Sequence, residues 1–231
     1  MPAKNSLKLY AENGFYHLYN RGVEKRPIFC DRQDYSVFLS YLKEYLTPKN
    51  LSQLQTAATS PTTPPAEKQA AINAIARNNF AGEIELICFV LMPNHFHFLL
   101  RQNNPKSIDK FINSLCTRYT MYFNLKYQRV GKLYQGVYKA VLVETNEQLL
   151  HLSRYIHLNP TPPGRKLPLS NPAPSSLSDF LGKTNTPWLK THYVLDNFSK
   201  TSLNNSYLSF LKSAPKDKEE IISAICLDNP D

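Results

Sequence analysis

Two apolar runs separated by a short turn constrain the fold of this chain more than any other feature. Glu83–Leu91 is the strongest strand candidate in the sequence, and His95–Arg101 has the pattern of a second strand. Met92, Pro93 and Asn94 lie between them and are typical of a turn. We therefore predict that these residues form a β-hairpin.

Helical and strand patterns surround this hairpin. They predict the order strand, helix, strand, strand, helix, strand or hairpin, and helix. This order fits an α+β fold of ferredoxin-like (RRM-like) type, an antiparallel sheet with helices on one face. The other expected elements are a strand at Phe15–Asn20, a helix begun by Asp31 or Asp34 and ended by Pro48, a helix from Ser107 to about Tyr127, a hairpin-like stretch at Lys132–Val143, and a helix from Thr145 through Leu158.

Two segments rich in proline and small polar residues divide the chain. Residues 49–79 have no large apolar side chain between Leu54 and Ile72, so we expect a mobile insertion at Thr56–Pro65 and a short helix at Ala66–Asn78. A Pro/Ser-rich linker follows residue 160. We predict one domain at 1–164, then a linker and a helical C-terminal extension at 165–231, with helices near Asp196–Lys212 and Lys216–Cys226.

The chain is strongly basic, which points to a polyanionic partner. It has 27 Lys and Arg against 18 Asp and Glu, a formal net charge of +9. Nucleic acid is the commonest polyanion, although a merely basic surface fits the charge alone equally well. The 14 Tyr and 12 Phe, many beside Lys or Arg, suit single-stranded nucleic acid, because bases stack on rings while phosphates meet cations.

Membrane insertion and secretion are not indicated. The longest apolar run, Leu86–Met92, is far shorter than the roughly 20 residues of a spanning helix. The first residues have no apolar signal core, and the four cysteines form no Cys-x-x-Cys pair. We therefore expect a cytoplasmic protein with reduced thiols.

His95 and His97 are the first candidates for chemistry. Residues two apart on a strand face the same side, so both imidazoles should point to one face of the sheet. Two imidazoles so placed can share a divalent metal ion, with manganese and zinc both suitable. The pair alone also fits two ordinary strand histidines.

The last helix of the predicted domain offers further ligands. His151, Tyr155 and Asn159 are spaced by four residues, which places them on one helix face. The tyrosine and amide oxygens could meet a metal ion held by the strand histidines, and His151 is a competing third ligand. Tyr155 could instead pack and donate a single hydrogen bond.

Four stretches of the chain carry a resemblance to a known family. They are Tyr16–Gly22, Phe89–Leu100, Gly131–Lys139 and Arg154–Pro160, and they run in the family's order over about residues 14–164. Together they resemble the HUH-type single-strand DNA transposases, specifically the REP-associated tyrosine transposase branch. Ser175–Gly182 with Pro187–Leu189 is similar to the C-terminal extension of many members.

The chain departs from the family pattern in two places. The insertion at 49–79 is unusually long. Where relatives often show Trp-Gln-x-Arg-Phe-Lys, this chain has Tyr-Gln-Gly-Val-Tyr-Lys at residues 134–139, with Val137 in place of the arginine.

The resemblance implies an enzyme that cleaves and rejoins single-stranded DNA, and hence DNA transposition. His95 and His97 match the metal-binding histidines, Tyr155 matches the nucleophile, and Asn159 matches a polar position where relatives place a third ligand. The implied cofactor is Mg²⁺ or Mn²⁺, the intermediate a 5′-phosphotyrosine, and the substrate a hairpin-forming, REP-like strand bound by a monomer or homodimer. Expected DNA-binding residues are Arg21, Lys25, Arg26, Arg118, Lys132, Gln135 and Lys139.

Two other functions fit the same residues. A ferredoxin-like sheet can bind single-stranded nucleic acid without chemistry, and Phe96 and Phe98 would then stack on bases. A zinc hydrolase could instead use His95, His97 and His151 with a metal-bound water.

Overall fold

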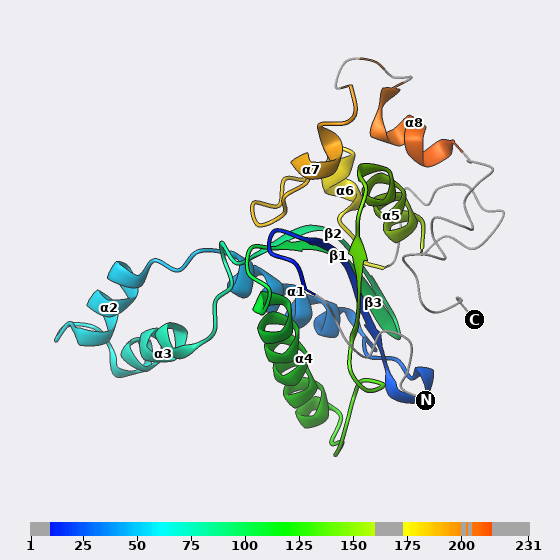
Figure 1. Cartoon of the computed structure of the whole chain (residues 1–231). Coiled ribbons are helices and arrows are strands. Elements are labelled where there is room, and N and C mark those ends of the chain that lie inside the picture. Colours follow the sequence, from blue (N-terminus) through cyan, green and yellow to red (C-terminus); the bar gives the residue numbers. More distant parts are fainter. Residues whose placement is uncertain (1–9, 160–172, 200–201, 203–204, 214–231) are drawn as a thin grey trace.

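The structure is a computed structural model that describes residues 10–159, 173–199, 202 and 205–213. Its centre is a four-stranded antiparallel sheet in the order β2-β3-β1-β4 (Figure 1). This order, with the helices packed on the sheet, confirms the predicted α+β, ferredoxin-like class. The elements of the sheet domain are β1 (Phe15–Arg21), α1 (Arg32–Leu46), β2 (Ile84–Met92), β3 (His95–Gln102), α4 (Ser107–Lys126), β4 (Lys139–Val143) and α5 (Asn146–Leu158), with a short 3₁₀ turn at Val23–Lys25.

The predicted β2–β3 hairpin is confirmed, and its pleat separates two kinds of side chain. Met92 pairs with His95 across the turn, and Ile84 pairs with Gln102 at the other end. Phe96 and Phe98 enter the hydrophobic cluster beneath α1 and α4, whereas Leu99 enters a second cluster beneath α5. Each face of the sheet therefore has its own core.

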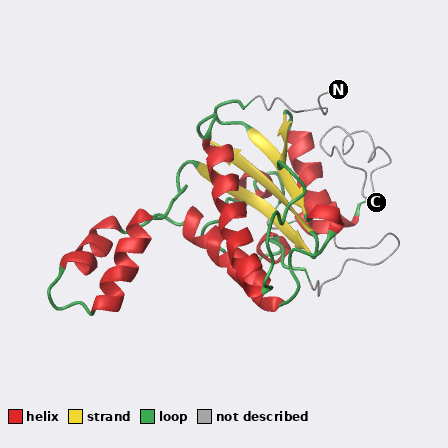
Figure 2. Ribbon diagram, turned by 90° about the horizontal axis from the view of Figure 1, so that it is seen from below, coloured by secondary structure: helices red, strands yellow, loops and turns green. Residues whose placement is uncertain are grey.

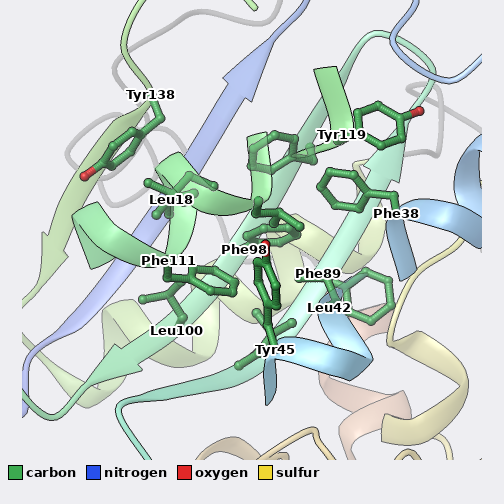
Figure 3. Packing of buried hydrophobic residues seen from close by; sticks show 14 of the residues in the cluster. Leu18, Phe38, Leu42, Tyr45, Phe89, Phe98, Leu100, Phe111, Tyr119 and Tyr138 are labelled. Atoms are coloured by element: carbon green, nitrogen blue, oxygen red, sulfur yellow. The ribbon is translucent and has the colours of Figure 1, made fainter. Parts of the chain in front are cut away.

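The first core lies between the sheet and the helix pair α1 and α4. Asp31 caps α1 by accepting from the Asp34 backbone N–H, and the Asp34 side chain returns the bond, so the helix begins where the sequence predicted. The rings of Phe38, Phe98 and Phe111 meet in this layer (Figure 3). Full burial of each such side chain contributes about 1.5–3 kcal/mol to folding.

The second core lies between the opposite face of the sheet and α5. Leu152 and Ile156 of α5 pack with Val90 and Leu99 of the sheet. The C-terminal extension adds three short helices on this side, α6 (Leu177–Phe180), α7 (His192–Leu195) and α8 (Tyr207–Lys212). Helices α7 and α8 contact α5, and α7 also contacts β2. Two helices cover one face of the sheet, as predicted, and α5 with the extension covers the other (Figures 1 and 2).

The insertion folds as a helical arm, which corrects part of the prediction. Helices α2 (Leu51–Thr59) and α3 (Pro65–Ala76) pack on each other and project from the sheet domain (Figure 2). The helix near 66–78 is confirmed, but residues 56–59 are helical and not part of a mobile loop. Asn50 caps α2, and the small Ala71 is buried, so short side chains suffice for this contact.

Three other expectations also need correction. Residues 132–138 form no strand of a hairpin: Tyr134 makes a single bridge to Gly22, and its ring enters the first core, which takes this segment away from β4. The cap of α4 is Lys106, because Ser107 is already helical. Within 196–212 only Tyr207–Lys212 is helical among the described residues, and the helix expected at 216–226 lies outside them.

None of the helices in the described ranges has both the length and the apolar character that a bilayer crossing requires.

Candidate functional site

His95 and His97 lie on the α5 face of β3, as their spacing predicts. Their ring centroids are 5.0 Å apart and the rings are nearly perpendicular. His95 is half-buried, and His97 is buried with 6% of its surface exposed. The two imidazoles therefore border one small region at the end of β3 that follows the hairpin turn.

The turn residue Asn94 orients the His95 ring. Its amide Nδ2 donates to the Lys25 carbonyl at 3.2 Å, which turns Oδ1 toward His95. That Oδ1 lies 2.6 Å from His95 Nδ1. An amide oxygen only accepts, so His95 Nδ1 carries the proton, and the neutral ring keeps a lone pair on Nε2.

Both imidazoles are held in their neutral form. Burial lowers the pKa of His97 well below its usual value, and the neighbouring rings of His17 and His95 lower it further. Burial also lowers the pKa of His95, a hydrogen bond with Asn159 opposes this shift, and the charge of Arg21 adds to it. Neutral imidazole is the form that can coordinate a metal ion.

Helix α5 brings Tyr155 and Asn159 to these imidazoles. Thr145 caps the helix, and its apolar stripe packs on the sheet, so the Tyr155 side of the helix borders β3. The Tyr155 ring presents its edge to His97, with centroids 5.6 Å apart. Asn159, one turn later, hydrogen-bonds His95. The structure thus gathers all four side chains that the sequence singled out for metal binding and nucleophilic attack.

His151 does not join them, so the prediction that it competes as a third ligand is wrong. Its Nδ1 lies 3.0 Å from Arg154 Nη2, and its ring packs against Phe210 of α8, on the outer side of α5. Helical spacing shares a face only approximately, and four residues advance the helix by slightly more than one turn.

The alternative in which bases stack on Phe96 and Phe98 is also wrong. Both rings have 0% exposed surface and lie beneath α1 and α4, on the face away from the imidazoles. Alternation along β3 sends these rings and the histidines to opposite faces.

The donor set fits a first-row divalent ion. In the described part of the chain, no group of three or more His, Cys, Asp or Glu side chains is arranged to hold a metal ion. The candidate ligands are therefore the two imidazoles and the amide oxygen of Asn159. Imidazole nitrogen suits first-row transition ions, whereas Mg²⁺ prefers oxygen, so of the two ions implied by the resemblance this set favours Mn²⁺.

A family comparison matches the part of the chain that carries this site. Residues 66–159 match the family model described as "Transposase IS200 like". The matched stretch includes β2, β3, α4, β4 and α5, and thus His95, His97, Tyr155 and Asn159. This part of the chain is therefore similar to the IS200-like transposases. No curated protein sequence matches the chain.

Two solved structures are similar to this chain at low identity. One is a REP-associated tyrosine transposase bound to a REP hairpin, with 11% identity and a TM-score of 0.49 over 80% of this chain and 89% of that chain. The other, described as a transposase candidate from Deinococcus radiodurans R1, has 14% identity and a TM-score of 0.35 over 68% of this chain and 95% of that chain. Both scores are below 0.5, so the similarity to IS200-like transposases rests on the sequence match over residues 66–159.

Two further residues border the site, and the sequence did not single them out. His17 and Tyr19 of β1 lie on the same face as His97. The Tyr19 ring stacks on His97 with centroids 5.4 Å apart, and His17 Nε2 lies 2.9 Å from His97 Nδ1, within hydrogen-bond distance. The only signal in the sequence is that they are two residues apart, which places both on one face of a strand. That face adjoins His97 only because β1 pairs with β3.

Three of the expected DNA-binding residues lie near the imidazoles. Arg21 donates to Gln135 at 2.6 Å, and Lys139 lies over the Tyr19 ring at 5.8 Å, so these three are near the imidazoles. Lys25 and Lys132 are exposed, and Arg26 pairs with Glu24 at 2.8 Å.

Arg118 lies elsewhere in the structure. It projects from α4, pairs with Glu44 at 2.8 Å and stacks on Tyr41 at 3.8 Å. Helix α4 covers the opposite face of the sheet, so Arg118 connects α4 to α1 and is not part of the group beside the imidazoles.

Proposed function

We propose that this chain is a transposase that cleaves and rejoins hairpin-forming, REP-like single-stranded DNA through a 5′-phosphotyrosine on Tyr155. A divalent ion, Mn²⁺ or Mg²⁺, would be held by His95, His97 and Asn159. The observation that carries the proposal is the approach of the Tyr155 ring to His97, with centroids 5.6 Å apart, on the face where Asn159 meets His95.

The chemistry follows from the residues at this face. The hydroxyl oxygen of Tyr155 attacks the scissile phosphorus, the P–O3′ bond breaks, and the leaving oxygen takes up a proton to become a 3′-hydroxyl. The phenol gives up its own proton, which is difficult at neutral pH because an ordinary tyrosine has a pKa of about 10. A divalent ion at the site would polarise the phosphate and offset the charge that builds on it.

Rejoining is the same step in reverse. The phosphotyrosine bond replaces the broken phosphodiester, so a second 3′-hydroxyl can attack it, release the Tyr155 hydroxyl and join a new pair of ends. The roles of Arg21, Gln135 and Lys139 in this proposal are to hold the phosphates next to the tyrosine. All three lie at the β1–β4 side of the imidazoles.

Two other tyrosines of the matched motif are less suited to the attack. Tyr134 is buried in the first core. The Tyr138 hydroxyl bonds Asp109 and lies 2.6 Å from the Tyr10 hydroxyl, and its ring also belongs to the first core. Both are on the face away from His95 and His97.

The test is adduct formation with a single-stranded hairpin oligonucleotide and Mn²⁺. Wild type should form a protein–DNA adduct that survives denaturation and is lost with EDTA. Tyr155→Phe should bind the oligonucleotide and form no adduct. Tyr19→Phe is the matched control, because Tyr19 also contacts His97 but stacks on it face to face; it should keep the adduct. An adduct at the wild-type level in Tyr155→Phe would overturn the proposal.

A further inference from the structure

The most informative group outside the proposed catalytic set is His17, in the middle of β1. It has 0% exposed surface and lies among apolar residues of the second core, beside Leu99 in β3 and Val141 in β4. Burying a polar ring in such a place is unfavourable unless it is hydrogen-bonded. An apolar side chain of similar size would pack at this position equally well.

The pleat and the register aim this ring at His97. His17 pairs with Leu99, and Tyr19 pairs with His97, so His17 is the diagonal neighbour of His97 on one face. The two rings are nearly parallel, 18° apart, with centroids at 5.1 Å. His17 Nε2 is 2.9 Å from His97 Nδ1.

A hydrogen bond between two imidazoles needs one donor and one acceptor. If His97 Nδ1 donates to His17 Nε2, the lone pair of His97 is on Nε2 and can coordinate a metal ion. In the reverse arrangement His97 Nε2 carries a proton and cannot coordinate one.

His95 indicates which arrangement holds. Its Nδ1 donates to the Asn94 amide oxygen, which leaves its Nε2 unprotonated. A site that uses both rings as ligands needs His97 to be protonated on Nδ1 as well. His17 would then accept a hydrogen bond from His97 Nδ1, as Asn94 does from His95 Nδ1. Metal-bound histidines generally have such a partner at the other ring nitrogen.

We propose that His17 is a positioning residue: its Nε2 accepts a hydrogen bond from His97 Nδ1–H, which orients the His97 ring and presents its Nε2 to the divalent ion. This inference deepens the proposed function and rests on it for the presence of a metal ion. The tautomer of His97 depends on its hydrogen bonds alone. In this proposal His17 is not itself a ligand, because its Nε2 is engaged with His97 Nδ1 at 2.9 Å.

The first experiment measures the tautomer in the metal-free wild-type chain. A long-range ¹H–¹⁵N spectrum, with His97→Gln to assign the signals, should show His97 protonated on Nδ1 and His17 unprotonated on Nε2. A wild-type His97 that is protonated on Nε2 overturns the proposal. This result does not depend on DNA cleavage or on the folding of any His17 variant.

The second experiment measures Mn²⁺ affinity by calorimetry on the full chain without DNA. His17→Phe keeps a flat ring but removes the acceptor, and its affinity should fall about 10- to 100-fold. His17→Gln places Oε1 near the position of the imidazole Nε2 and should restore most of the affinity. Thermal unfolding of both variants separates this effect from a loss of packing.

The outcomes separate the two proposals. If His17→Phe is folded and binds Mn²⁺ as tightly as wild type, His17 is only a buried core residue and this inference is wrong. If wild type binds no Mn²⁺ while His97 is protonated on Nδ1, the orientation by His17 stands and the metal in the proposed function is wrong.

Discussion

The guanidinium of Arg154 stacks on the Phe210 ring, with its central carbon 3.9 Å from the ring centroid. Its Nη1 also donates to the Phe210 carbonyl at 3.0 Å. Arg154 directly precedes Tyr155, so α8 of the C-terminal extension is attached to the helix that carries the proposed nucleophile. Helix α5 is thereby held between the sheet on one side and the extension on the other.

Replacing Arg154 with Met should release α8 from this helix. The carbonyls of Phe210 and Ser213 would lose their charged donor, and hydrogen bonds to charged groups contribute about 1.5–3 kcal/mol each. We expect the free energy of unfolding to fall by about 2 kcal/mol in urea titrations, with faster amide exchange in 207–213. Arg77→Met removes an exposed ion pair with Glu44 and should cost less than about 1 kcal/mol. Equal losses in the two variants would contradict the attachment.

A second attachment, through His157, predicts a pH dependence of stability. Its Nδ1 lies 2.7 Å from the Tyr207 hydroxyl and its Nε2 lies 2.8 Å from Ser176 Oγ. Burial lowers the pKa of His157 to about 3, against about 6.5 in an unfolded chain. Between these two pH values the unfolded state binds more protons than the folded state. The contribution of His157 to stability is therefore complete above about pH 6.5, and it falls by about 1.4 kcal/mol for each pH unit below that.

His157→Gln tests this dependence, because its amide can bond both partners without titrating. Unfolding free energies of wild type and variant should be compared from pH 7.5 to 4.5. Other buried imidazoles titrate in both proteins, so the informative quantity is the difference between the two curves. As the pH falls, the unfolding free energy of wild type should decrease steadily relative to that of the variant. Parallel curves would show that His157 is protonated in the folded protein.

A buried carboxylate connects α1 to the end of α4. Asp34 has 0% exposed surface, and its oxygens accept from Lys126 at 2.7 Å, Tyr122 at 3.0 Å and Tyr127 at 2.8 Å. Burial would raise the pKa of Asp34, but these donors lower it below its usual value. Asp34→Ala leaves Lys126 without its buried partner and should cost about 3 kcal/mol of stability. Asp31→Ala, at the exposed neighbour of the same lysine, should cost clearly less in the same thermal or urea unfolding assay.

Binding of single-stranded DNA should weaken with salt, in proportion to the phosphates contacted. Arg21→Met and Lys139→Met should each reduce the slope of log affinity against log salt by about 0.7, the value for one phosphate contact on a single strand. Arg77→Met, at the base of the helical arm, should leave the slope unchanged. Fluorescence anisotropy of a labelled hairpin at several salt concentrations measures this. A wild-type affinity that does not vary with salt would exclude the group beside the imidazoles as a phosphate contact.

Local patterns predicted most of the sheet domain correctly. The alternation of His95–Arg101, the turn at Asn94 and the caps Asp31 and Thr145 act within a few residues, so they can be recognised without a partner segment. The helical arm was harder to predict, because its helices are short in apolar residues and each is stabilised by the other. The 132–138 segment was misjudged because Tyr134 packs in the core instead of pairing along a strand.

By itself the sequence determined which residues could do chemistry at all. The two-residue spacing in β3 puts His95 and His97 on one face, and the four-residue spacing in α5 puts Tyr155 one turn before Asn159. Only the tertiary structure decided that these faces meet, that His151 turns toward α8, and that His17 contacts His97. The reason is physical: spacing fixes direction within one element, whereas the contact between elements depends on strand order and on the side of the sheet against which a helix buries its apolar stripe.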